Sequence, residues 1–531
     1  MLSCVFAHRS VAQSTTSLLP DATVLPRRGV DFRLLTSWTR YDQLFGVGEP
    51  HNIASSLNAD SLGSALVPQF AIAESAIRTA AGLPSFRLTA GNLVAIGDSR
   101  IVTAPLIAQY GLTSRLTVGV VIPLVETRTT LFAQLNPHLG AANVGPNPAL
   151  ANADQLARNA GLVTSFRTAA TALQQKLAQC QATPTGTGCS TLLAQQTAAQ
   201  NLIQTTASFT GAVETLYGTS ETHPGQAFVP IAGGPAQLAI NAQIQNLITQ
   251  YQGFLGNTIS GSVVAAGGPG ARAAFQDLLA SMGRDSLQST DRSSIGDISL
   301  GATYQLANTF GDTTAATAGA MRYRLAVNGT VRIGTGQPAS RQRLLDIGTG
   351  YGQPGVEIGG AADVQVGRRY SATATGSYTA QLGTIAVSRL ANPGNALLPL
   401  DVSPLNLGGT YSAGNVLSLS VIPRMRIAGY FAITGQYSLV RTGADEYSLT
   451  GSPAGATGAG QASLAGLGAS AATAQQVGFG VAYSTIVGRE RGPGRLPFEA
   501  SFSHLETISA SGGPVAKTFR DQIELRVYFI R

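Results

Sequence analysis

Histidine is the residue most often used for proton transfer near neutral pH, and the chain has five of them. No two have the spacing of metal ligands, and neither lysine follows the glycine that a phosphate-binding loop requires. The sequence therefore predicts no metal site, no cofactor and no catalytic residue. The histidines are His8, His51, His138, His223 and His504.

Seven charged residues share the polar side of segments in which polar and apolar residues alternate. If that side lines a lumen, these charges set the selectivity of the lumen for its solutes. Mutual ion pairing that fills a narrow interior is the competing interpretation, because a barrel of intermediate size need not hold an open channel. The seven lumen-lining candidates are Arg322, Arg324, Arg332, Glu357, Asp363, Glu524 and Arg526.

Cys180 and Cys189 flank a turn-like segment at residues 181–188. Their spacing allows a small disulfide loop, which would suit an oxidising compartment such as the periplasm or the cell surface. Two free buried thiols are the alternative.

The elements that position these residues are strands, because apolar residues recur at every second position. In residues 115–125, Leu116, Val118 and Val120 share one side, whereas Thr117 and Gly119 share the other. Soluble strands average five or six residues, while longer ones match the apolar band, about 25 Å tall, of an outer-membrane barrel. We predict strands over residues 31–41, 86–110, 115–125, 298–306, 322–333, 356–366, 370–382, 417–421, 430–439, 477–487, 498–508 and 519–531.

Short turns at one end of the strands and long connections at the other are typical of such a barrel. Short turns are predicted at residues 111–115, 367–369, 423–429 and 488–497. An even number of strands then places both termini on the short-turn, periplasmic side. Residues 133–292 break the alternation and show helical spacing near 148–179, 191–216, 236–255 and 271–281. This insertion is expected on the extracellular side, where it either caps the mouth or enters the lumen.

The composition fits a barrel in lipid better than a soluble β-sandwich. Charged residues make up 11% of the chain, against about 25% in soluble domains, and the wet faces of a sandwich would call for more Lys and Glu. The arginines behind the net charge of +7 are scattered singly, which argues against a nucleic-acid partner. Near the N-terminus, Ser10-Val11-Ala12 has the small-x-small pattern of a signal-peptidase site, which we interpret as part of a residual secretory signal.

Two stretches carry a family resemblance. They are YGLTSRLTVGVVIPL at residues 110–124 and IGDISLGATYQL at residues 295–306. Together they resemble the meta-pathway phenol-degradation barrels and, more distantly, the long-chain fatty-acid transporter type. The resemblance covers about half the chain and implies passive passage of small, often hydrophobic solutes. Two departures are the size of the helical insertion and the terminal Arg531, where such barrels usually end in an aromatic residue.

We therefore predict an all-β transmembrane barrel of about twelve antiparallel strands with a large α-helical loop insertion. Residues 1–30 would form the residual signal and N-terminal segment, 31–132 strands one to three, 133–292 the helical insertion, and 293–531 strands four to twelve. The expected function is that of a monomeric channel or transporter, not an enzyme, in the bacterial outer membrane. Its expected partners are outer-membrane lipid, a small solute and the barrel-assembly machinery.

Two alternatives remain open. One is a structural or surface-interaction barrel without transport. The other is an outer-membrane phospholipase that uses His504, which shares the parity of Phe498 and Phe502 and is expected to face lipid. The His-x-Ser arrangement of such enzymes is missing, because Leu505 and Glu506 follow His504.

Overall fold

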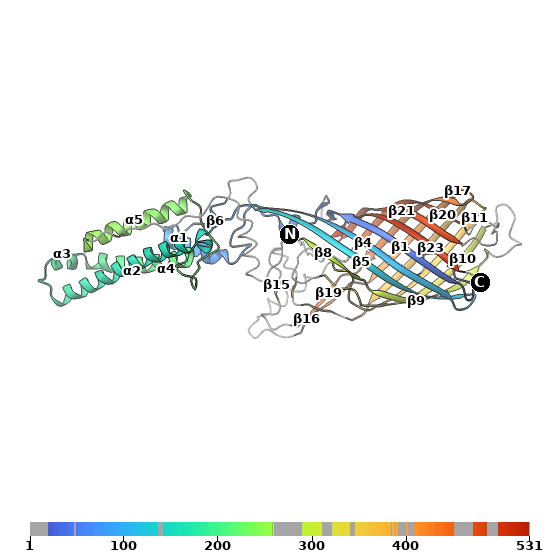
Figure 1. The fold of residues 1–531 in the computed structure, drawn as a ribbon, viewed down its shortest axis with the longest axis horizontal. Coiled ribbons are helices and arrows are strands. Elements are labelled where there is room, and N and C mark those ends of the chain that lie inside the picture. The colour runs from blue at the N-terminus through green and yellow to red at the C-terminus, as the bar shows by residue number, and fades with distance from the viewer. Residues whose placement is uncertain are drawn as a thin grey trace. The chain divides into compact units, whose positions relative to one another are not determined.

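The chain forms two compact units in the computed structural model (Figure 1). Unit 1 comprises Met1–Ser56, Ile96–Phe132 and Asp285–Arg531, and unit 2 comprises Leu57–Ala95 and Ala133–Arg284. No described helix is long and apolar enough to cross a membrane. The structure describes residues 18, 20–46, 49–135, 142–256, 259, 289–310, 321–339, 346–383, 385–387, 389–390, 400–401, 408–450, 471–485 and 497–529.

Unit 1 is built on a closed antiparallel barrel, which confirms the predicted twelve-stranded fold. Consecutive long strands are neighbours, and the wall closes because β1 pairs with β23 on one edge and β4 on the other, while β4 also pairs with β5. The twelve strands are β1 Val30–Tyr41, β4 Leu93–Gly111, β5 Leu116–Leu135, β9 Ile298–Asn308, β10 Met321–Ile333, β11 Gly355–Val366, β12 Tyr370–Gln381, β17 Val416–Ala428, β18 Phe431–Thr442, β20 Ala472–Ser484, β21 Phe498–Gly512 and β23 Phe519–Phe529.

A shorter strand, β8 (Thr290–Ile295), continues the line of β9 and also pairs with β5. Gly296 and Asp297 separate β8 from β9. Small sheets accompany the barrel at the end of the long connections. Their strands are β2 Gln43–Phe45, β3 His51–Asn52, β13 Ile385–Val387, β14 Arg389–Leu390, β15 Leu400–Asp401, β16 Gly408–Ser412, β19 Glu446–Thr450 and β22 Val515–Ala516.

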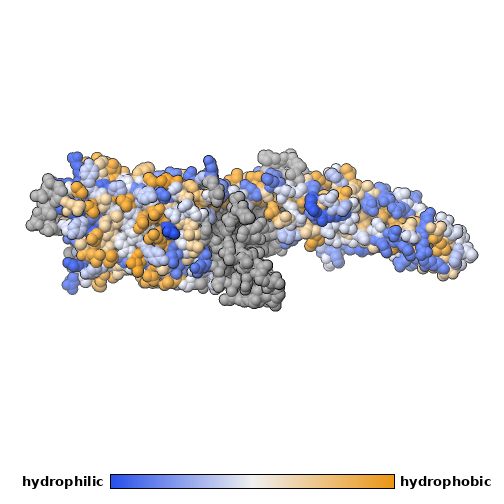
Figure 2. All heavy atoms as spheres, turned by 180° about the vertical axis from the view of Figure 1, so that it is seen from behind, coloured by the Kyte–Doolittle hydropathy of each residue, from blue (hydrophilic) through white to orange (hydrophobic). Residues whose placement is uncertain are grey.

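The barrel is apolar outside and polar inside. In β10, Tyr323, Leu325 and Val331 are exposed, whereas Asn328 and Thr330, on the opposite face, are buried. Figure 2 shows apolar side chains spread over the barrel strands on the face drawn. A closed barrel of this polarity satisfies its backbone internally and presents its greasy side to lipid, as outer-membrane barrels do.

Several strand boundaries differ from the prediction; the largest extension is in β5, which runs on to Leu135, ten residues beyond the predicted end. The second strand begins at Leu93, not at residue 86, and its first residues still belong to unit 2, which runs to Ala95. The predicted turn at 423–429 is wrong, since β17 runs on to Ala428 and only Gly429 and Tyr430 separate it from β18. Pro423 is typical of a turn because it has no N–H for a strand ladder. In the structure it lies within β17, and the pairing of β17 with β18 skips it. Residues 271–281 and most of 488–497 lie outside the described part.

Unit 2 is a helical bundle with its own apolar core. The long helices α2 (Ala153–Ala182) and α4 (Gln196–Tyr217) pack side by side, and α5 (Pro235–Leu255) contacts both. The helix α1 (Phe70–Ala81) packs on α4 and α5, although it comes from the connection between β1 and β4. The remaining elements are α3 Cys189–Ala194, the 3-10 helices Ser55–Leu57 (at the boundary of the two units) and Pro148–Ala151, and the paired strands β6 Val144–Pro146 and β7 Phe228–Pro230.

Phe166, Leu173, Leu247 and Tyr251 are among the side chains buried in this bundle. The buried Tyr251 hydroxyl donates a hydrogen bond to Thr206 Oγ1 at 2.8 Å. Asn152 caps α2, its side chain accepting from the first amides of the helix, and Pro235 starts α5. The predicted helices at 148–179, 191–216 and 236–255 thus overlap α2, α4 and α5.

Candidate functional site

The inner face of the barrel carries the charged residues that the sequence singled out, and most are already paired within the wall. Arg324 on β10 lies opposite Asp363 on β11, and their side chains form an ion pair at 2.8 Å. Thr373 on β12 donates a further hydrogen bond to Asp363 at 2.7 Å. The arginine also lies over the ring of Phe310, 4.4 Å from its centroid.

Arg526 on β23 is the most enclosed of the candidate cations. Its Nε donates to Asp31 of β1 at 2.8 Å, and its Nη1 lies 3.5 Å from a carboxylate oxygen of Asp21. The guanidinium also lies over the ring of Tyr528. Asp31 and Arg526 are 0% and 4% exposed, so the pair is removed from bulk water.

Glu524 pairs with Arg33 at 3.6 Å. Arg33 and Arg526 lie directly opposite each other in the register of β1 and β23. Two like charges in such positions repel, but here each arginine has its own carboxylate on the neighbouring strand. The inner face therefore neutralises its own charges.

The remaining three candidates lie on β10 and β11. Arg332 hydrogen-bonds to Gln381, lies 3.8 Å from the carboxylate of Asp297 and stacks over Tyr351. Glu357 accepts a hydrogen bond from Thr379 at 3.1 Å. Arg322 is half-buried near the start of β10, and no ion pair is formed by it among the described residues.

A further feature, which no pattern in the sequence indicated, is an N-terminal segment lying against this inner face. We define it as Leu18 together with residues 20–29. Leu18, Ala22 and Leu25 are 4%, 0% and 3% exposed. Leu18 packs with Ile107 and Val121 on β4 and β5, and Ala22 packs with Ala326 and Ala361 on β10 and β11.

Side chains of the wall hold the backbone of the N-terminal segment. Asp363 accepts from the amide of Ala22, and Gln305 donates to the carbonyl of the same residue. Thr117 accepts from the amide of Leu25, and Gln109 donates to the carbonyl of Leu18. These partners come from β4, β5, β9 and β11, so the segment lies in the lumen, at the end with the short turns.

Asp21 in the N-terminal segment is electrostatically matched to this position. Burial by itself raises the pKa of its carboxyl, but the positive charges of Arg526 and Arg324 and hydrogen bonds from Thr23 outweigh that effect and leave the pKa below its ordinary value. Asp21 is therefore negatively charged at neutral pH while the N-terminal segment lies in the lumen.

An apolar stripe runs along the inner faces of β4 and β5. It consists of Ile101, Ile107, Val121 and Val125, all buried. Leu18 covers the stripe toward the short turns. Toward the long connections, Tyr41, Ile53, Ile347 and Ala516 pack with Ile101 and Val125. The stripe is thus covered at both ends, mainly by chain segments outside the twelve strands of the wall, with Tyr41 at the end of β1 as the exception.

Asp297, at the break between β8 and β9, anchors the connection from β10 to β11. Its carboxylate accepts from the amides of Gly336, Tyr351 and Gly352, at 2.7, 2.8 and 3.3 Å. A side chain on Gly350 would bring a Cβ within 3.0 Å of this carboxylate. Ile347 in the same connection is one of the residues that cover the apolar stripe.

His504 lies on the outer face, as its parity with Phe502 indicated. Its Nδ1 lies 2.8 Å from Asp521 Oδ1, and its ring packs against Phe479. Among the described residues, no hydroxyl group hydrogen-bonds to this pair. No described group of His, Cys, Asp and Glu side chains could hold a metal ion.

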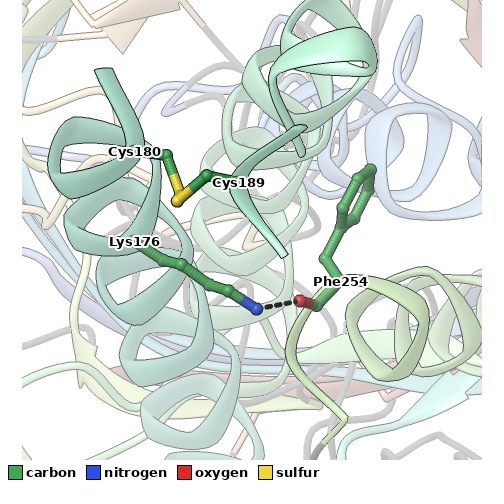
Figure 3. Close-up of a disulfide and its surroundings, with 4 residues drawn as sticks. All are labelled: Lys176, Cys180, Cys189 and Phe254. Atoms are coloured by element: carbon green, nitrogen blue, oxygen red, sulfur yellow. Dashed lines mark hydrogen bonds between the residues drawn. A yellow bond between two sulfur atoms is a disulfide. The ribbon is translucent and has the colours of Figure 1, made fainter. Parts of the chain in front are cut away.

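Cys180 and Cys189 are joined by a disulfide in unit 2, at the end of α2 and the start of α3 (Figure 3). One turn earlier on α2, Lys176 donates to the carbonyl of Phe254 near the end of α5 at 2.8 Å. The two links tie α3 and α5 to the same end of α2.

Comparison with known proteins finds similarity to solved outer-membrane barrels. The chain is similar to an outer-membrane channel from Pseudomonas putida F1 (TM-score 0.40, 8% identity, covering 96% of this chain and 98% of that one). It is also similar to the toluene transporter TbuX of Ralstonia pickettii (0.27, 10%, 96% and 91%) and to a Pseudomonas aeruginosa FadL homologue (0.24, 9%, 94% and 90%). No family model and no curated protein matches the sequence.

Proposed function

We propose that this protein is a passive outer-membrane channel for small hydrophobic solutes, closed on its periplasmic side by the N-terminal segment. The observation that carries the proposal is the apolar stripe of Ile101, Ile107, Val121 and Val125 inside a largely polar barrel. Apolar residues on an inner wall are expected where an apolar molecule gains from contact with them, at about 25 cal/mol per Å² buried.

The inner charges fit this role better than selection of ions. Arg324, Arg526 and Glu524 each have a partner in the wall, so they offer little unbalanced charge to a passing ion. Once the N-terminal segment has left the lumen, a neutral solute moving along β4 and β5 would meet Ile107 and Val121 of the apolar stripe instead. We place both termini in the periplasm, because β1 begins and β23 ends beside the short turns.

A reversible lock tests whether the N-terminal segment closes the channel. Ala22 and Ala326 pack together, so the full-length Ala22→Cys/Ala326→Cys variant is expected to form a disulfide across the contact. Planar-bilayer conductance should be near zero when it is oxidised and should return on reduction to the level of the parent. The single variant Ala326→Cys, treated identically, controls for reduction of Cys180–Cys189. Equal conductance in both redox states would refute closure by this segment.

The solute class is tested separately by Val121→Asp, which places a charge in the apolar stripe. Cells producing this variant should take up a neutral aromatic solute more slowly than the parent, while uptake of a sugar of similar size changes less. Equal slowing of both solutes would indicate simple obstruction. A structural barrel would pass neither solute in the parent, and a phospholipase would instead hydrolyse lipid in a reaction lost on His504→Ala.

A further inference from the structure

Arg520 on β23 is a cation of the inner face that the wall does not neutralise. In the register of the barrel it lies opposite Thr39 of β1 and Leu505 of β21, whose side chains are buried on that face. Its Nε is buried without a hydrogen-bond partner, although the residue as a whole is partly exposed. Among the described residues, no carboxylate forms an ion pair with it. The guanidinium is thus enclosed by the barrel and remains open to a ligand in the lumen.

Other arginines of the inner face show that this arrangement is exceptional. Arg33, Arg324 and Arg332 also have a buried Nε without a hydrogen bond. Each of them lies near a carboxylate oxygen, at 3.6, 2.8 and 3.8 Å respectively. Arg526, on the same strand as Arg520, has two carboxylates. Because an enclosed cation without a partner is costly, we expect the partner of Arg520 to come from outside the chain.

The inner wall around Arg520 consists of neutral side chains that are satisfied among themselves. The hydroxyls of Ser37 and Thr103 share a hydrogen bond of 2.7 Å on β1 and β4. The hydroxyls of Thr507 and Thr518 share another of 2.7 Å beside β21 and β23. These groups leave the positive charge of the guanidinium unbalanced.

The carboxylates nearest along β23 do not reach Arg520. Asp521, the next residue, faces the outside of the barrel, where it contacts a histidine. Glu524 faces inward but lies four residues away, about 13 Å along the strand, and has its own arginine partner. Asp21 of the N-terminal segment contacts Arg526, about 20 Å along the strand, so this segment leaves Arg520 uncovered.

Arg520 also lies beside apolar side chains. Arg520, Thr39 and Ile101 occupy directly opposed positions on the adjacent strands β23, β1 and β4. Since neighbouring strands are about 4.8 Å apart, the backbone of Arg520 is about 10 Å from Ile101, which belongs to the apolar stripe. Leu505 borders the arginine on its other side. A single cation therefore stands next to an apolar part of the inner wall.

We propose that Arg520 binds the carboxylate of a small hydrophobic acid, at the end of the lumen with the long connections. A guanidinium binds a carboxylate through two parallel hydrogen bonds, and water screens such a pair less inside a barrel than at a surface. One cation in neutral surroundings balances one negative charge, which favours a monocarboxylate over a doubly charged phosphate. The apolar stripe and Leu505 match an acid whose body is apolar. This inference rests on the proposed channel function and names a class of solute within it.

Direct binding tests the site without requiring transport. The full-length protein in detergent micelles would be titrated with benzoate and, separately, with benzamide, which has nearly the same shape and no charge. Ligand-observed NMR gives the two dissociation constants. The parent should bind benzoate at least about 10-fold more tightly than benzamide, because a charge-assisted hydrogen bond contributes about that factor.

Arg520→Gln should weaken benzoate binding to the level of benzamide and leave benzamide binding unchanged. Arg520→Lys keeps the charge without the paired geometry and should give an intermediate affinity. The matched control is Arg40→Gln, which removes one exposed arginine from the position next to Thr39 on the outer face and should bind benzoate like the parent. Heat-modifiable gel migration confirms that each variant is folded.

Four results would overturn the proposal. They are equal affinity of the parent for benzoate and benzamide, unchanged benzoate binding in Arg520→Gln, an equal loss in Arg40→Gln, and displacement of benzoate by acetate at equal concentration. The last result would mean that Arg520 binds any small anion and does not select an apolar body. Failure of the channel function is distinguishable, because benzoate would then bind as expected while cells producing the protein take up neither benzoate nor benzamide.

Discussion

Replacing Arg526 by alanine should strongly destabilise the barrel, because the change leaves a buried carboxylate without its main partner. Arg526 Nε lies 2.8 Å from Asp31, which is 0% exposed. Breaking a buried pair from one side costs about 3–5 kcal/mol, since the remaining charge stays desolvated. Arg33 already pairs with Glu524 and can compensate for only part of this loss.

The second carboxylate beside Arg526 provides an internal comparison. Asp21 lies 3.5 Å from Nη1, and its side chain is 28% exposed. Water therefore screens this contact, and Asp21→Asn should lower the free energy of unfolding by about 1 kcal/mol or less. The two carboxylates of one arginine should thus separate the stability of the wall, through Asp31, from the proposed closure of the lumen, through Asp21.

The measurement is denaturant unfolding of the reconstituted barrel, followed by the fluorescence of Trp38. Arg526→Ala should shift the midpoint far more than Asp21→Asn. Asp31→Leu/Arg526→Met removes both charges and should recover most of the loss, because apolar residues of similar volume can replace a buried pair. A double variant as unstable as Arg526→Ala would show that the unpaired carboxylate is not the cause of the instability.

The pKa of Asp21 is held below its ordinary value, so the contribution of this carboxylate to the proposed closure is complete above about pH 4 and is lost as the pH falls further. Single-channel conductance should rise as the pH falls through that range, and Asp21→Asn should abolish the rise. Reducing the Cys180–Cys189 disulfide should lower the stability of unit 2 by about 2–3 kcal/mol, seen as an earlier loss of helical circular dichroism while heat-modifiable migration of the barrel is unchanged. Asp297→Ala leaves the amides of Gly336, Tyr351 and Gly352 without their acceptor and should increase hydrogen exchange at residues 346–354. Unchanged exchange would show that Asp297 does not anchor the connection from β10 to β11.

The barrel was predictable because its strands obey a single period. Residues such as Tyr323, Leu325 and Val331 had to face lipid once Asn328 and Thr330 faced inward, and the structure places them so. The sequence also identified the side of the wall that carries Arg324, Asp363 and Arg526. It could not identify their partners, because register between strands far apart in the chain decides which residues meet.

The N-terminal segment was missed because it has no periodicity of its own. Leu18, Ala22 and Leu25 look like residues of a processed leader, and only the wall that surrounds them reveals their position. The partners that hold them, such as Gln109 and Gln305, look like ordinary polar strand residues. Helix α1 was missed for a related reason, since it comes from a connection between strands and gains its core only by packing on α4 and α5.

The way in which the N-terminal segment is held explains how it could close a channel without being part of the wall. Four of its contacts join a backbone group to a side chain on β4, β5, β9 or β11, and none of these four belongs to a strand ladder. Each such bond contributes about 1 kcal/mol, because water replaces it when it breaks. Beyond Arg28 and Gly29 the chain pairs with Gly111 and becomes β1, where most residues are paired with both neighbouring strands. The boundary between a displaceable segment and a permanent wall therefore falls at residues 28–30, and a hinge at that point would let the segment leave the lumen while every strand of the barrel stays paired.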